Sequence, residues 1–165
     1  MKRLALYNKK RDFSLTKEPE GTVGERGSFN FVVQKHHATR LHYDFRLQLD
    51  GVLKSWAVPK GPSEEPGEKR LAVMVEDHPV NYINFKGIIP EGNYGAGKVE
   101  IWDKGKYIPI NEKFENITEK KAITNLKNGE FKFKIKGKKL KGSYVLVRLK
   151  DSDKNWLLIK HKDIG

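Results

Sequence analysis

The sequence has 165 residues, and its 33 lysines and arginines against 21 aspartates and glutamates give a net charge of +12. Such an excess favours polyanionic partners, with nucleic acid ahead of an anionic membrane. The absence of cysteine excludes disulfides, thiolate metal sites and a cysteine nucleophile, and no apolar run resembles a membrane span or signal peptide, so a cytoplasmic protein is expected.

Residues 1–27 are polar and rich in glycine, which is typical of a flexible N-terminal arm with little regular structure of its own. Two interpretations remain open for this arm. It is either a disordered tail or a segment that folds over a bound polyanion and contributes Arg11. Residues 28–165 are expected to form a single domain.

Residues 41–49 alternate strictly between apolar and polar side chains, which predicts a β-strand with one apolar and one polar face. The polar face carries His42, Asp44, Arg46 and Gln48, an unusual set for a surface strand. The neighbouring elements are predicted as a strand at 29–35, a connection at 36–40, a hairpin turn at Asp50-Gly51 and a return strand at 52–58.

Further strands are predicted at 71–78, 98–103, 130–136, 142–149 and 156–160, and one helix at 118–126 that Asn128-Gly129 ends. In the strand at 71–78, alternation predicts an apolar face made of Leu71, Val73 and Val75. Many short strands at hairpin spacing with one or two short helices predict a mainly β fold. We expect a compact, closed or partly closed barrel of antiparallel strands.

His42 and Asp44 share one face of their strand, so their Cβ atoms are expected roughly 6.5–7 Å apart. Two ligands can close that gap around one metal ion, and His36, from the preceding connection, could supply a third. Two nitrogens and an oxygen without thiolate suit Mn²⁺, Fe²⁺, Co²⁺ or Zn²⁺.

Arg46, next on the same face, could place its guanidinium where a metal-bound phosphate would sit. Glu76 and His78 are candidates for a general acid or a phosphate contact. If both polar faces point into the barrel, the two strands converge on one interior cavity. His161 is expected at the surface.

Two other functions compete with a phosphate site. A His-x-Asp pair with a distant histidine also forms the iron site of non-haem oxygenases, here with His42, Asp44 and either His78 or His161. Alternatively, the chain is a non-catalytic nucleic-acid-binding barrel whose aromatic and basic residues 131–136 form the binding face. The same stretch also fits an amphipathic strand with its lysines in water.

Several longer motifs carry a family resemblance. Residues 31–47 (FVVQKHHATRLHYDFRL) resemble the signature of the 3′-phosphoesterase domain of bacterial DNA ligase D. The resemblance continues through GVLKSWAVPKGPS at 51–63, VEDHP at 75–79, IPEGNYGAG at 89–97 and WD at 102–103. It covers at least residues 10–105, and more loosely the C-terminal strands.

This resemblance implies a compact β-barrel that heals 3′ ends of primer strands with Mn²⁺. Such enzymes remove a 3′-terminal ribonucleotide and then the 3′-phosphate, leaving a 3′-hydroxyl. The resemblance implies that His36, His42 and Asp44 bind the metal and that Arg46 and His78 contact the phosphate. It implies catalytic positions in the arm at Arg11, Asp12 and Glu18. It also implies further pocket positions at Arg70, Glu76 and Tyr82.

One position departs from the family pattern, since Asn93 stands where histidine is frequent, and an amide cannot perform acid–base chemistry. The chain resembles a free-standing member or an excised domain, because it holds no polymerase or ligase sequence. The resemblance further implies a monomer whose substrate is a primer–template. Separate ligase, polymerase and Ku-type repair proteins are the implied partners, and the implied setting is nucleoid-associated repair.

Overall fold

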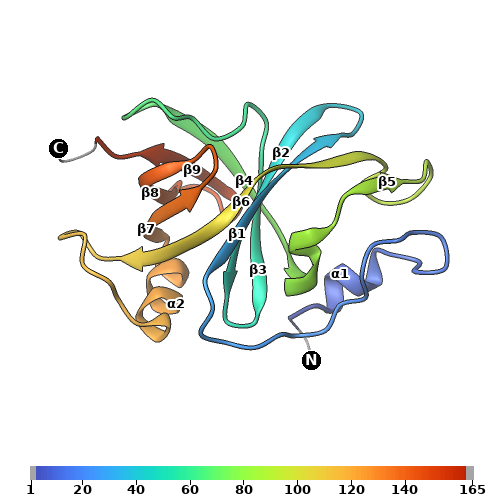
Figure 1. The fold of residues 1–165 in the computed structure, drawn as a ribbon, viewed down its shortest axis with the longest axis horizontal. Coiled ribbons are helices and arrows are strands. Elements are labelled where there is room, and N and C mark those ends of the chain that lie inside the picture. The colour runs from blue at the N-terminus through green and yellow to red at the C-terminus, as the bar shows by residue number, and fades with distance from the viewer. Residues whose placement is uncertain (1–2, 163–165) are drawn as a thin grey trace.

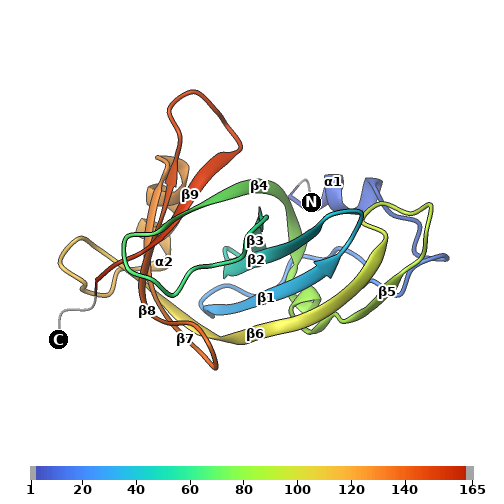
Figure 2. The same cartoon turned by 90° about the horizontal axis from the view of Figure 1, so that it is seen from above.

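The computed structural model describes residues 3–162; residues 1, 2 and 163–165 of the predicted arm and domain lie outside this range. Eight strands close into an antiparallel barrel in the order β1-β2-β3-β4-β9-β8-β7-β6, and β6 pairs back onto β1 (Figures 1 and 2). The strands are β1 (Asn30–His37), β2 (Leu41–Leu49), β3 (Val52–Val58), β4 (Lys69–Pro79), β6 (Gly97–Ile110), β7 (Glu130–Gly137), β8 (Lys141–Arg148) and β9 (Asn155–Lys160). The predicted antiparallel barrel is confirmed.

Four short elements complete the fold of residues 3–162, and three of them lie outside the barrel wall near its N-terminal half. These three are α1 (Ala5–Lys9), the 3₁₀ helix η1 (Val80–Asn84) and β5 (Gly87–Ile89), which extends the sheet from β6. The helix α2 (Glu119–Lys127) matches the prediction closely. The Thr118 side chain accepts the Lys121 N–H at its start, and Gly129, with φ +88°, follows its end.

The hairpin of β2 and β3 has the predicted bounds, and its turn residues Asp50 and Gly51 both have positive φ. One correction concerns β1, which was expected to end at residue 35. It continues to His37, so that His36 lies directly opposite His42 in the β1–β2 ladder. His36 therefore belongs to a strand rather than to a connecting loop.

β1, β2 and β3 are buried on both faces. Alternate residues such as Phe31, Phe45 and Trp56 enter the main core, which receives side chains from all eight barrel strands. The opposite face, which includes Val32 and Leu53, packs against a second layer made of the arm, η1 and β5. The polar residues of β2 share this second face, so the expectation of an interior cavity is wrong.

The apolar face predicted for β4 is also wrong. Leu71 is 44% exposed, whereas Ala72 is fully buried in the main core. The register of the β3–β4 ladder shifts between Leu53 and Ser55, and such a bulge re-aims side chains. As a result, Val75 and His78 both reach the second layer.

The strand predicted at 98–103 is longer in the structure, since β6 runs to Ile110. Gly105 and Pro109 interrupt its pattern, but the backbone still pairs with β7. The turn after β7 is fixed by Asp103, whose carboxylate accepts backbone N–H groups of Lys138, Lys139 and Leu140.

The aromatic residues of β7 are buried in the main core, while Lys134 and Lys136 are exposed. This confirms the amphipathic interpretation of the strand. The N-terminal arm packs on the barrel in this structure, because Leu4, Tyr7 and Glu18 are all buried. No helix in the described part of the chain has the length and apolar character needed to span a membrane.

Candidate active site

The predicted ligand set comes together on the β1–β2 ladder. One potential ligand atom each of His36, His42 and Asp44 lies within 4.8 Å of the others. The Asp44 carboxylate is 3.3 Å from His36 Nδ1 and 3.2 Å from His42 Nε2. Among the described residues, this cluster includes neither His78 nor His161, so the arrangement expected for the oxygenase alternative does not form.

The outer nitrogen of each imidazole is held by a backbone carbonyl. His36 Nε2 donates to the Gly95 oxygen at 2.7 Å, and His42 Nδ1 donates to the Arg40 oxygen at 3.2 Å. With each outer N–H fixed in this way, loss of the inner proton would leave the lone pairs of His36 Nδ1 and His42 Nε2 facing the shared centre beside Asp44. Metal-binding histidines are fixed in this way, so the donor set fits a divalent cation.

The electrostatics of Asp44 favour a cation at the same centre. Burial raises its pKa, but the Arg46 guanidinium and hydrogen bonds from His36 and His42 outweigh burial, so the pKa lies below the ordinary value. The hydrogen bond to Asp44 conversely raises the pKa of His42. Asp44 is therefore a carboxylate at neutral pH.

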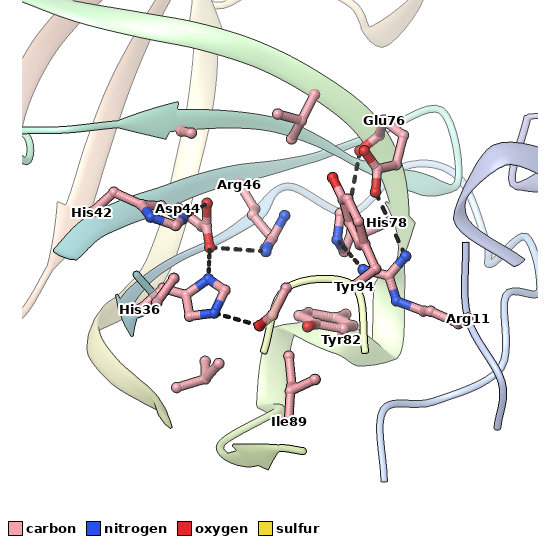
Figure 3. A pocket seen from close by; sticks show the side chains of 15 residues that line it. Arg11, His36, His42, Asp44, Arg46, Glu76, His78, Tyr82, Ile89 and Tyr94 are labelled. Atoms are coloured by element: carbon pink, nitrogen blue, oxygen red, sulfur yellow. Dashed lines mark hydrogen bonds and ion pairs between the residues drawn. The ribbon is translucent and has the colours of Figure 1, made fainter. Parts of the chain in front are cut away.

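Arg46 lies next to this cluster with its guanidinium oriented by a buried amide. Its Nε donates to Gln34 Oε1 at 2.7 Å, and one Nη is 3.5 Å from Asp44. The other, Nη1, is buried and has no hydrogen-bond partner among the described residues. A buried guanidinium with a free donor lining a pocket is suited to a phosphate oxygen (Figure 3).

The arm brings a second arginine to the same pocket. Arg11 donates from Nε to Glu18 at 2.9 Å, and its guanidinium lies 3.9 Å from the centre of the Tyr7 ring. The same Glu18 oxygen accepts the Tyr82 hydroxyl at 2.7 Å. Burial raises the pKa of Tyr82 well above its ordinary value, so this hydroxyl stays a donor.

His78 is neutral in this environment. Burial, followed by the charges of Arg46 and Arg11, lowers its pKa well below the usual value. Its Nδ1 donates to the Glu76 carbonyl at 2.9 Å, which leaves Nε2 to accept from Arg11 at 3.3 Å. His78 Nε2 therefore carries no proton in this arrangement and acts as a hydrogen-bond acceptor.

The pocket enclosed by these residues has a volume of about 290 Å³. Glu76, on its wall, forms ion pairs with Lys10 at 3.2 Å and with Arg11 at 3.5 Å. The predicted site residues that line the pocket are Arg11, His36, His42, Asp44, Arg46, Glu76, His78 and Tyr82.

Other predicted residues lie elsewhere. Asp12 is exposed and accepts hydrogen bonds from Ser14, and Arg70 pairs with Glu68 and the carbonyls of residues 60 and 61. Glu18 is buried behind the pocket, where it holds Arg11. His161 is half-buried against Phe114, away from the pocket.

The prediction from sequence missed three contributors. Gln34 orients Arg46, Tyr94 closes the pocket beside Lys10, and Gly95 holds His36 with its carbonyl. Gln34 could have been found, because it precedes His36 by two residues and so shares its face. The role of Gly95 depends on its positive φ of 76° in a turn, which the sequence does not specify.

Fold and site together define a small antiparallel β-barrel with a basic, histidine-containing pocket that is suited to a phosphorylated ligand. A family profile described as the DNA ligase D 3′-phosphoesterase domain matches residues 34–148. The chain belongs to this family.

Curated relatives extend the similarity over nearly the whole chain. The multifunctional non-homologous end joining protein LigD of Pseudomonas aeruginosa is 48% identical over 98% of this chain. The LigD proteins of Mycolicibacterium smegmatis and Mycobacterium tuberculosis H37Rv are 45% and 46% identical over 98% and 88% of it. The chain spans 19%, 21% and 18% of the lengths of these three relatives, about a fifth of each.

Proposed function

We propose that this chain is a metal-dependent 3′-phosphoesterase that processes nucleic-acid ends for repair. It would remove a 3′-terminal ribonucleotide and then the 3′-phosphate, leaving a 3′-hydroxyl. The observation that carries the proposal is the placement of a buried arginine with a free Nη1 beside two histidines and a carboxylate that suit a divalent cation. Family membership supports the same reaction class.

His36, His42 and Asp44 would hold the cation, with Mn²⁺ as the proposed ion and Co²⁺ or Zn²⁺ as compatible alternatives. A bound divalent ion supplies Lewis-acid stabilisation of phosphoryl oxygens and lowers the pKa of water. The carbonyls of Gly95 and Arg40 keep the inner nitrogens of both histidines available for that ion.

The pocket's own side chains would do the remaining work. Arg46 would donate from Nη1 to a non-bridging phosphate oxygen, and Arg11 would add a second positive charge that stabilises the transition state. His78 would orient Arg11 by accepting its hydrogen bond at Nε2, and its lowered pKa keeps it neutral in that role. Water is the proposed nucleophile.

The proposed substrate is a primer–template with a 3′-ribonucleotide or 3′-phosphate, and the proposed setting is cytoplasmic, nucleoid-associated repair. The relatives are named as non-homologous end joining proteins. Separate ligase, polymerase and Ku-type proteins are the proposed partners in that setting, with this chain acting as a monomer.

The direct test is phosphate release from a 3′-phosphorylated primer–template, with and without Mn²⁺. We expect Mn²⁺-dependent conversion to a 3′-hydroxyl by the wild type and loss of at least about 100-fold in Asp44→Asn. His42→Ala should show a similar loss, and His37→Ala is its matched control, because His37 points away from the pocket and pairs with Glu100.

The same assay separates the competing functions. A binding barrel would shift the primer on a gel without shortening it, and an oxygenase would consume O₂ with a 2-oxo acid. The proposal is overturned if the wild type yields no 3′-hydroxyl product with any of the three metals.

A further inference from the structure

A basic hollow lies on the barrel far from the pocket. It has a volume of about 740 Å³ and is lined by parts of β1, β6, β7 and β8 together with residues 27–29. Four of its twelve lining residues are lysines and none is a carboxylate. The lysines are Lys106, Lys134, Lys136 and Lys141, all of them exposed.

Three of these residues form a row across adjacent strands, which we call the lysine row: Lys106, Lys136 and Lys141. Lys106 is the direct cross-strand partner of Lys136, and Lys136 is that of Lys141. Direct partners in antiparallel strands project on the same face at short range, and like charges in such pairs are destabilising. The described residues contain no ion pair to any of the three.

The row has a defined spacing from the pocket. β1 and β6 run side by side between the two sites, with His36 opposite Val99 at the pocket and Asn30 opposite Lys106 at the row. Figure 2 shows β6 passing from β5 toward β7 and β8. Seven residues of strand span roughly 23 Å, which corresponds to about seven base pairs of duplex.

We propose that the lysine row is a second nucleic-acid contact, which binds the phosphate backbone of the duplex behind the 3′ end held in the pocket. The position of the duplex, with its 3′ end in the pocket, rests on the proposed function. The affinity of the lysine row for duplex DNA can be measured whether or not that function holds. Three observations fit the binding of a regular polyanion at this site. The lysines lie in register without a paired carboxylate in the described part of the chain, the lining of the hollow contains no carboxylate, and the row is separated from the pocket by the length of several base pairs.

The test compares DNA hairpins with 4-bp and 12-bp stems and a 3′-hydroxyl end, by fluorescence anisotropy over a range of salt concentrations. The variant is Lys106→Gln/Lys136→Gln/Lys141→Gln. The control, Lys113→Gln/Lys150→Gln/Lys154→Gln, removes the same charge from exposed residues in loops outside the hollow.

The wild type should bind the 12-bp stem more tightly than the 4-bp stem. The row variant should lose at least about ten-fold in affinity for the 12-bp stem at 0.1 M salt. The logarithm of the binding constant falls linearly with the logarithm of the salt concentration, and the magnitude of this slope should fall by about 0.9 for each lysine that neutralises a phosphate. The control variant should retain most of the wild-type affinity.

Equal losses in both variants, or no loss in the row variant, would overturn the proposal. It is also overturned if the row variant loses binding to phosphatidylserine vesicles but keeps its affinity for the 12-bp stem. Release of phosphate from a 3′-phosphorylated 4-bp stem reports on the pocket alone. Failure of that release in the wild type would contradict the proposed function and leave the binding comparison intact.

Discussion

The hydroxyl of Tyr82 donates to Glu18 at 2.7 Å, which joins the N-terminal arm to the 3₁₀ helix η1. The same carboxylate oxygen accepts from Arg11, so one buried anion fixes two pocket side chains from different elements. The arm thereby becomes part of the site wall, although its residues from 3 onward contribute no strand to the barrel.

Glu18→Gln should destabilise the protein by about 3–5 kcal/mol, because it removes the nearer of the two carboxylates that pair with the buried Arg11. Urea unfolding measures this change, and faster proteolysis of the arm should accompany it. Glu20→Gln, at an exposed position, is the matched control. Equal stability of the two variants would show that the Arg11 contact does not hold the arm.

Arg46→Lys should reduce phosphate release by about 10²–10³-fold while leaving Mn²⁺ binding intact. An ammonium cannot donate to Gln34 and present a second, fixed donor to phosphate at the same time. Steady-state kinetics and calorimetric titration of Mn²⁺ separate the two properties. Arg26→Lys, a substitution at an exposed arginine, should change neither of them.

His78 should make the stability of the protein depend on pH. Its pKa is lowered in the folded protein, so below about pH 6.5 the unfolded chain binds a proton that the folded chain does not. The free energy of unfolding should therefore fall as the pH falls through this region, with a slope of at most about 1.4 kcal/mol per pH unit from this residue. Urea titrations at pH 7.5 and 5.5 measure it.

His78→Gln provides the comparison for that slope, since the other titratable groups remain in place. The variant should lose less stability than the wild type between the two pH values. His161, whose pKa burial also lowers, contributes to both proteins and cancels in the difference. A slope identical in both proteins would mean that the pKa of His78 is the same in the folded and unfolded states.

Lys136→Gln should stabilise the barrel at low salt, because it removes like-charge contacts with both Lys106 and Lys141. The expected gain is about 0.2–1 kcal/mol in the free energy of unfolding, and it should shrink at high salt. Lys134→Gln, whose direct partners are Ile108 and Ser143, is the control. A salt-independent gain would point to packing rather than charge.

The local sequence pattern was sufficient to predict the bounds of those elements that are short and regular. The bounds of β2 and β3 follow from strict alternation and from the Asp50-Gly51 turn, and α2 follows from its cap residues. In contrast, β6 was underestimated because Gly105 interrupts the alternation, and pairing with two neighbouring strands maintains the extended backbone there.

The candidate site was likewise predictable from the sequence only in part. The ligands on β2 were evident from residue type and spacing, whereas the strand position of His36 depended on where β1 ends. The burial of Tyr7 and Glu18 could not be predicted, because the arm has no periodic pattern and is ordered by contacts with distant elements. The bulge that brings Val75 and His78 to one pocket is likewise a product of tertiary pairing.

The opposed positions of His36 and His42 also bear on how the protein folds. All three proposed ligands lie on one hairpin, while barrel closure joins β1 to β6, much further along the chain. Hairpin contacts form quickly and long-range pairing forms slowly. The ligand cluster should therefore assemble before the barrel closes, and a divalent cation present during refolding should accelerate refolding as well as stabilise the final state.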